Sequence, residues 1–275
     1  MKFISANVQA FSEVTSLLVK HRTLAFEMAR RELTERYAGQ ALGMFWTIAH
    51  PLFMMGLYLF VFVVVFKTKV GNSVSMPLDY SAYILAGLIP WLGFQEALSK
   101  ACTAVTSNAN LVKQVIFPVE ILPAKTALAT GFTQVVSTVL LLLYIAFSQR
   151  VVWASFLLIP VLMLLQMMMM IGLGFLLAST SAFFRDLKDF VQLYCLAGMY
   201  LLPVVYLPEW VPALFQPILY LNPFSYMVWC YQDAIYFGRI AHPVAWIIFP
   251  VSSVFVFLAG YRVMRRLKPF LGNVL

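Results

Sequence analysis

Long apolar segments alternate with short polar ones along the chain, and this alternation predicts six membrane-spanning helices. Together the six segments hold a single Asp, Glu, Lys or Arg residue, Glu96. A helix needs about 20 apolar residues to cross the hydrocarbon layer of a bilayer, and most of these segments approach or exceed that length. The predicted spans are residues 42–66, 80–99, 126–147, 152–180, 190–205 and 244–261.

Residues 8–36 have a different pattern, which predicts an amphipathic helix lying in the membrane interface. Apolar side chains recur on one helical face, while Glu13 and Lys20 lie on the opposite one. The helix ends in a charged cluster that includes Arg31 and Glu35. This cluster is either a solvated surface or a docking surface for a soluble partner.

The region before the last span is apolar but rich in proline. Five prolines between positions 203 and 223 exclude a straight spanning helix. Irregular chain facing lipid would leave backbone polar groups unpaired, so we predict two re-entrant helices in the outer leaflet, at 208–220 and 224–237. The candidate residues for an outer gate in this region are Pro208, Trp210, Asn222 and Pro223.

Composition agrees with a membrane location. Hydrophobic residues make up 62% of the 275 residues and charged residues only 11%, against about 25% in soluble domains. The predicted fold is therefore an all-α integral membrane domain covering residues 1–275. The net charge of +8 does not point to nucleic acid, and the scattered cysteines and histidines do not form a metal-binding pattern.

The distribution of basic residues predicts the orientation of the chain. With six spans and both termini inside, the inner segments hold 15 of the 19 Lys and Arg residues. Basic residues stay on the cytoplasmic side, so the N and C termini are expected there, with residues 262–275 as a basic tail.

One polar segment, residues 108–123, interrupts the apolar pattern between the second and third spans. Residues 109–116 can form a helical turn or two before Pro118, which does not continue a helix. Lying in water between two spans, this segment could receive mechanical work from a soluble partner as a coupling helix. The alternative is a plain connector.

Aromatic side chains follow one face of the first span, at Trp46, Phe53 and Phe60. On the fifth span a corresponding stripe would consist of Phe190, Tyr194 and Leu201. These stripes either pack in the core or face lipid, or they line a passage for an uncharged or weakly charged cargo that is not tightly bound.

Motifs for an energy source or for hydrolysis are missing. No glycine in the chain is followed by lysine, so there is no phosphate loop of the G-x-x-x-x-G-K-[ST] type, and neither H-E-x-x-H nor G-x-S-x-G occurs. Only Glu96 and His50 come near the position of a proton relay. The chain is therefore predicted to depend on an external motor and not to be an enzyme itself.

Several motifs together resemble the ABC-type polysaccharide and polyol-phosphate export permeases. They are, in chain order, RRELTERY at 30–37, LGMFW at 42–46, AGL at 86–88, NLVK at 110–113, FPVEILP at 117–123, RD at 185–186 and LNP at 221–223. The resemblance covers essentially the whole chain. The order and spacing of the motifs together are more specific than any single motif.

The resemblance implies a homodimeric permease of the bacterial inner membrane, working with two copies of a separate ATPase subunit that binds ATP and Mg. The cargo would be a lipid-linked polysaccharide, with O-antigen as the main prediction and capsule or teichoic acid as alternatives. It also implies that the first and fifth spans face the two-fold axis. The residues expected to contact the ATPase are Arg31, Glu35, Asn110, Lys113, Phe117, Pro118, Glu120, Arg185 and Asp186.

Two other functions remain open at the level of the sequence. An exporter of drugs or small lipids would have the same architecture with a smaller cargo. A membrane scaffold of a glycan synthase complex would need neither a motor nor a passage.

Overall fold

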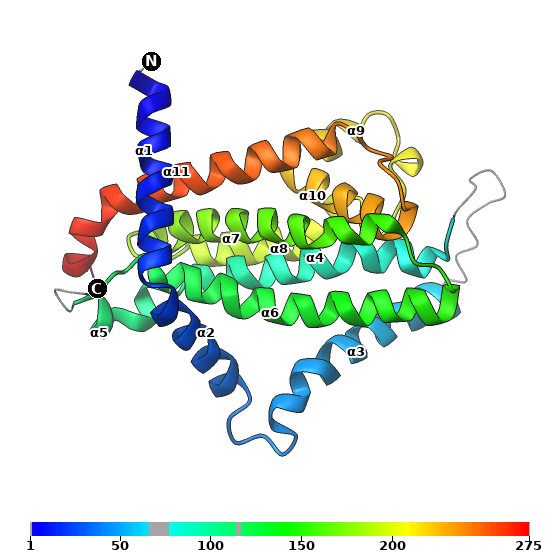
Figure 1. Ribbon diagram of the computed structural model, residues 1–275, viewed down its shortest axis with the longest axis horizontal. Helices are drawn as coiled ribbons and strands as arrows, with labels where there is room; N and C mark the ends of the chain where they lie inside the picture. Colours follow the sequence, from blue (N-terminus) through cyan, green and yellow to red (C-terminus); the bar gives the residue numbers. More distant parts are fainter. Residues whose placement is uncertain (1, 66–76, 114–116, 275) are drawn as a thin grey trace.

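The computed structural model describes residues 2–65, 77–113 and 117–274. Within these ranges the chain forms helices and no strand, as predicted. Long helices lie side by side and make up the body of the molecule (Figure 1). They are α4 (Tyr80–Ala101), α6 (Ile121–Tyr144), α7 (Ile159–Ser181), α8 (Leu187–Leu201) and α11 (Ala245–Val274).

Four helical segments of the described chain are long and apolar enough to cross a membrane: Gly43–Phe62, Ile121–Gln149, Ala154–Ser181 and Ala245–Gly272. They coincide with the predicted first, third, fourth and sixth spans. The predicted spans at 80–99 and 190–205 correspond to α4 and α8. α4 carries two charged residues and mixed polarity, and α8 has 15 residues, about 22 Å at 1.5 Å per residue, so neither meets the same criterion.

The amphipathic segment predicted as one helix at 8–36 is two helices, α1 (Lys2–Lys20) and α2 (Arg22–Arg36). The chain changes direction near His21, because the two helices pack on different partners. α1 crosses over α11, whereas α2 runs beside α6 (Figure 1). The prediction of a single helix was therefore wrong.

The first predicted span, 42–66, is helical from Gly43 to Val65. A 3-10 turn at Gly43–Phe45 leads into α3 (Trp46–Leu59), which ends in π-helical turns at Phe60–Val65. Residue 66 and most of the following loop lie outside the described residues. α2 and α3 form a V that projects away from the body of the molecule (Figure 1).

The proline-rich region before the last helix matches the prediction only in its second half. Residues 208–220 are not one helix: a 3-10 turn at Pro208–Trp210 is followed by an irregular segment and by α9 (Gln216–Leu221), because prolines interrupt the backbone hydrogen bonding. α10 (Pro223–Gln232) continues as a π-helical turn to Phe237, close to the predicted 224–237. Residues 227–236 are buried, which fits a segment packed inside protein.

The closest helix packing joins α7 to α11. A side chain on Gly260 would overlap the carbonyl group of Gly172, and one on Gly172 would meet the backbone at Phe257. α11 also continues to Val274, so the predicted tail 262–275 is helical over its described part. Its last turns contact α5 (Ala109–Val112) and the segment that leads into α6.

Candidate transport site and cytoplasmic contact surface

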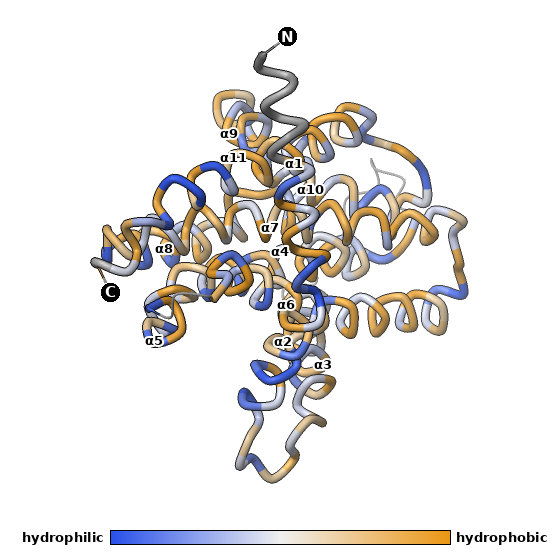
Figure 2. The backbone as a smooth tube through the Cα atoms, turned by 60° about the vertical axis from the view of Figure 1, so that its left-hand side comes forward, coloured by the Kyte–Doolittle hydropathy of each residue, from blue (hydrophilic) through white to orange (hydrophobic). Residues whose placement is uncertain are grey.

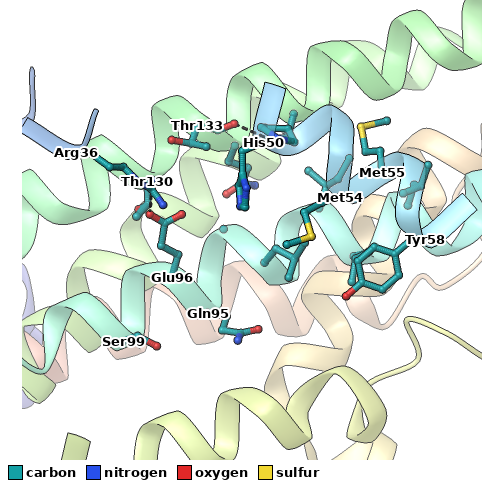
Figure 3. Close-up of a pocket in the computed structure, with 18 residues that line it drawn as sticks. Arg36, His50, Met54, Met55, Tyr58, Gln95, Glu96, Ser99, Thr130 and Thr133 are labelled. Atoms are coloured by element: carbon teal, nitrogen blue, oxygen red, sulfur yellow. Dashed lines mark hydrogen bonds and ion pairs between the residues drawn. The ribbon is translucent and has the colours of Figure 1, made fainter. Parts of the chain in front are cut away.

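A polar cavity of about 320 Å³ lies between α3, α4 and α6 (Figure 3). His50 and Tyr58 extend into it from α3, and Glu96 and Gln95 from α4. α6 contributes hydroxyl groups, including that of Thr133. Polar groups within a bundle of apolar helices are costly and are usually retained for function, so this cavity is a candidate transport site.

A network of ion pairs borders this cavity at Arg36 and Glu96 and connects α2 to α4 and α6. Arg36 lies 2.7 Å from Glu96, which is 3.0 Å from Lys100. Lys100 lies 3.3 Å and Lys125 lies 3.8 Å from Glu32. Charges from three helices therefore meet where α2 approaches the bundle. The sequence analysis did not predict this network, although the Glu96–Lys100 spacing of four residues was a possible signal.

Further inside, a chain of hydrogen bonds joins α4, α6, α7 and α10. The Gln134 amide donates to Gln166 Oε1 at 2.7 Å, and Tyr231 donates to the same oxygen at 2.7 Å. Gln166 donates to the Pro90 carbonyl at 2.9 Å. Gly93 leaves room for Gln134, because a Cβ there would lie 2.6 Å from Gln134 Oε1. Gln134 also lines the cavity. The hydrogen-bond network therefore fixes the position of one side chain in the cavity wall.

The aromatic stripe of the first span is exposed in the isolated chain. Trp46, Phe53 and Phe60 have relative exposures of 37%, 68% and 55%. None of the three lines the polar cavity. These side chains are therefore not part of the core of this chain, and their face of α3 is open to lipid, cargo or a second copy.

On α8 the structure separates the residues of the second predicted stripe. Phe190 is 69% exposed and Leu201 is also exposed. Tyr194 is half-buried, packs edge-on against Trp91 and donates a hydrogen bond to Asn222 Oδ1 at 3.4 Å. Asn222 also accepts from the backbone N–H of Phe224 at 3.1 Å, capping α10.

The other candidate gate residues occupy the turns around the short helices α9 and α10. Pro208 opens the 3-10 turn that contains Trp210, and the Trp210 ring lies 5.9 Å from that of Tyr80. Pro223 is the first residue of α10. The structure therefore brings Tyr194 and Asn222 together, while Trp210 lies against the N-terminal end of α4.

Most of the residues predicted to contact an ATPase lie near one end of the molecule, with α5 and the C terminus (Figure 1). Asn110 is in α5, Lys113 follows it and is exposed, and Phe117 and Pro118 are half-buried. The predicted helix at 109–116 ends at Val112 in the described chain, and residues 114–116 lie outside the described residues. Figure 2 shows hydrophilic segments at α5 and along α2.

Glu120 differs from its neighbours because it faces inward. Its side chain is 5% exposed, and Lys268 of α11 lies 2.6 and 2.9 Å from its two oxygens. Arg265, one turn earlier in α11, pairs with Glu13 of α1. The C-terminal turns of α11 therefore connect α1 to the segment that leads into α6.

Two further exposed elements complete this surface. Arg185 and Asp186 lie in the turn between α7 and α8, where Arg185 and Lys188 line a cavity of about 330 Å³ that also contacts α5. On α2, Arg31 donates to Glu35 at 2.6 Å, and this hydrogen bond and the carboxylate charge raise the pKa of Arg31. The described residues hold no group of three or more potential metal ligands.

The long apolar helices, the polar cavity between them and the charged segments at one end define an integral membrane transport protein. A sequence profile described as ABC-2 type transporter matches residues 23–236. The chain belongs to this family, which confirms the resemblance described above.

Curated relatives cover nearly the whole chain. An O-antigen export system permease protein RfbA from Klebsiella pneumoniae is 24% identical, over 90% of this chain and 93% of its own. A protein of the same name from Myxococcus xanthus is 28% identical, over 94% and 97%. The polysialic acid transport protein KpsM from Escherichia coli is 22% identical, over 84% and 90%.

Proposed function

We propose that this chain is the permease subunit of an ATP-driven exporter that moves a lipid-linked polysaccharide, most specifically O-antigen, out of the cytoplasm. The observation that carries this proposal is the end-to-end similarity to O-antigen export permeases from two organisms. The polar cavity and the exposed aromatic faces support it, since both suit a hydrated polymer with apolar sugar faces.

In this proposal the six spans are α3, α4, α6, α7, α8 and α11, and both termini face the cytoplasm of a bacterial inner membrane. The excess of Lys and Arg on one side supports this orientation. α4 and α8 lack the length or apolarity of an isolated span, but α4 is almost entirely buried by its neighbours. A helix shielded in this way does not need a continuous apolar surface.

The energy comes from a separate ATPase, present in two copies on a homodimer of this chain, which binds the ATP and Mg. Exposed Arg31, Glu35, Asn110, Lys113 and Arg185 support this arrangement, because charged and polar groups project from the end that is proposed to face the cytoplasm. Phe117, Pro118 and Asp186 complete the proposed contact, with Glu120 acting from behind it.

The cargo passes along the two-fold axis of the dimer. Exposed Trp46, Phe53 and Phe60 on α3, with Phe190 and Leu201 on α8, support a passage at this axis. Tyr194 contributes through its contact with Asn222, which connects α8 to the outer gate formed by Pro208, Trp210, Asn222 and Pro223.

A capsular polymer is the second candidate cargo, and the similarity to KpsM favours it. Deleting the gene in its own bacterium distinguishes the two. We expect loss of O-polysaccharide from the cell surface, accumulation of its lipid-linked form inside, and recovery on re-expression. Loss of capsule with normal O-polysaccharide would favour the second candidate, and loss of neither polymer would contradict both.

A further inference from the structure

An apolar groove runs along α2, separate from the polar cavity except that Gln134 borders both. It consists of two adjoining recesses of about 570 and 750 Å³ between α2, α6 and α7. Phe26 and Leu128 line both recesses, so they are continuous. Volumes of this size match ligand-binding pockets rather than packing defects.

The length of the groove corresponds to one leaflet of a bilayer. Along α6 it extends from Ala124, near the start of the helix, to Val135. Eleven residues of helix rise about 16 Å, which is about half of the ~30 Å hydrocarbon thickness. The groove therefore fits an acyl chain of a single leaflet, and a much longer polyprenyl chain would extend beyond it.

The walls of the groove suit a flexible chain. Met163, Met167 and Met170 of α7 line the larger recess. Methionine is unbranched and polarisable, and it adapts to apolar ligands of variable shape. Gly131 makes room for Met167, because a side chain at Gly131 would collide with the end of that methionine. Of the methionines at 167–170, Met167 and Met170 therefore form part of the groove wall in addition to packing between helices.

Two cations border the groove on α2. Arg22 lines the smaller recess and Arg30 the larger one. Neither forms an ion pair with an acidic side chain in the part of the chain that the structure describes, whereas Arg31 and Arg36 both do. Unpaired basic residues beside an apolar groove on the cytoplasmic side of a membrane protein complement the phosphate of an anionic lipid.

In the orientation proposed above, we propose that this groove binds an anionic glycerophospholipid of the cytoplasmic leaflet, with an acyl chain along α6 and α7 and the phosphate at Arg22 beside the smaller recess. Arg30, about 12 Å further along α2, adds to the positive charge that attracts the lipid. The lipid would hold α2 against α6, where only the small contact of Ala25, Ala29 and Leu33 is buried. Because Arg36, near the C-terminal end of the same helix, pairs with Glu96, occupancy would also fix the wall of the polar cavity.

Native mass spectrometry of the permease with its ATPase tests this site. The complex is placed in nanodiscs of equal parts phosphatidylglycerol and phosphatidylcholine with identical acyl chains, and the lipid retained after release is measured. We expect phosphatidylglycerol to be retained preferentially, and retention to fall about tenfold in the Arg22→Gln/Arg30→Gln variant, as loss of charge-assisted hydrogen bonds implies. A second variant, Val135→Trp, fills the larger recess and should lower retention without changing charge.

The matched control is Lys20→Gln, which removes a nearby positive charge that does not line the groove. Its retention should equal that of the unmodified complex. Equal retention of both lipids, or unchanged retention in the double arginine variant, contradicts the proposal. A further sample with added polyprenyl phosphate separates the two lipid classes: preferential retention of that lipid over phosphatidylglycerol would also overturn it.

Discussion

Glu120 and Lys268 are 148 residues apart in the chain, yet they form a tight ion pair behind the proposed coupling segment. Glu120→Gln leaves the ammonium group without its partner, and Glu120→Lys places two positive charges together in a buried position. We expect Glu120→Lys to lower the stability of the folded complex by about 3 kcal/mol, the lower end of the range for breaking a buried pair, because Lys268 is partly exposed.

The exchange variant Glu120→Lys/Lys268→Glu provides the control. If the pair acts within the chain, the exchange should recover most of the thermal stability in detergent and much of the ATP-driven export. Glu120→Lys complexes that keep full stability but lose ATPase binding would instead assign Glu120 to direct docking on the partner subunit.

The aromatic stripe gives a second prediction at the residue scale. Phe53 is 68% exposed and Phe94 is fully buried. Phe94→Ala should cost about 3–5 kcal/mol and deplete the folded protein from the membrane. Phe53→Ala should leave the amount of protein unchanged and slow export per dimer. If the Phe53→Ala protein were depleted from the membrane as strongly as the Phe94→Ala protein, the assignment of Phe53 to the transport pathway would be wrong.

Individual residues were predictable from the sequence only where local pattern determines their environment. The helical period placed Trp46, Phe53 and Phe60 on one face of the first span, although whether that face is buried or exposed was left open. The inward position of Glu120 does not, because it depends on a lysine in the last helix. The Gln134, Gln166 and Tyr231 network likewise joins three helices that are distant in sequence.

At the scale of helices, the contact between α7 and α11 depends on the absence of side chains. Gly260→Ala should destabilise the protein, since the new methyl group would meet the backbone carbonyl of Gly172, which cannot rotate away as a side chain could. Gly56→Ala in α3 is the matched control: nothing lies within 4 Å of its Cβ position, and alanine favours helix by about 1 kcal/mol. Unfolding temperatures in detergent compare the two, and equal values would contradict this packing account.

Hydrophobic length located the spans at α6, α7 and α11 from the sequence, because each of these helices overlaps a long uncharged run, at 126–147, 152–180 and 244–261. The single re-entrant helix predicted at 208–220 was wrong, because the spacing of the prolines permits only a 3-10 turn and a short helix. The break near His21 was also missed, since the residues on both sides favour helix and only their separate packing on α11 and α6 redirects the chain.

For the whole molecule, the proposed topology predicts where introduced cysteines react. The native cysteines Cys102, Cys195 and Cys230 are buried, so they should contribute little background. Leu214→Cys and Leu221→Cys, at positions 81% and 82% exposed, should react with an impermeant thiol reagent added outside. Phe184→Cys, at a position 72% exposed, should react only after the membrane is opened. The reverse pattern would invert the orientation.

The central claim, that this chain carries a lipid-linked polysaccharide across the membrane on energy from a partner ATPase, is tested most directly in inside-out membrane vesicles. The measurement is protection of labelled lipid-linked O-polysaccharide from a glycan-degrading enzyme added outside. We predict protection that requires ATP hydrolysis, the ATPase and this chain together. Polymer that stays accessible when all three are present, or becomes protected in vesicles lacking this chain, would contradict the account.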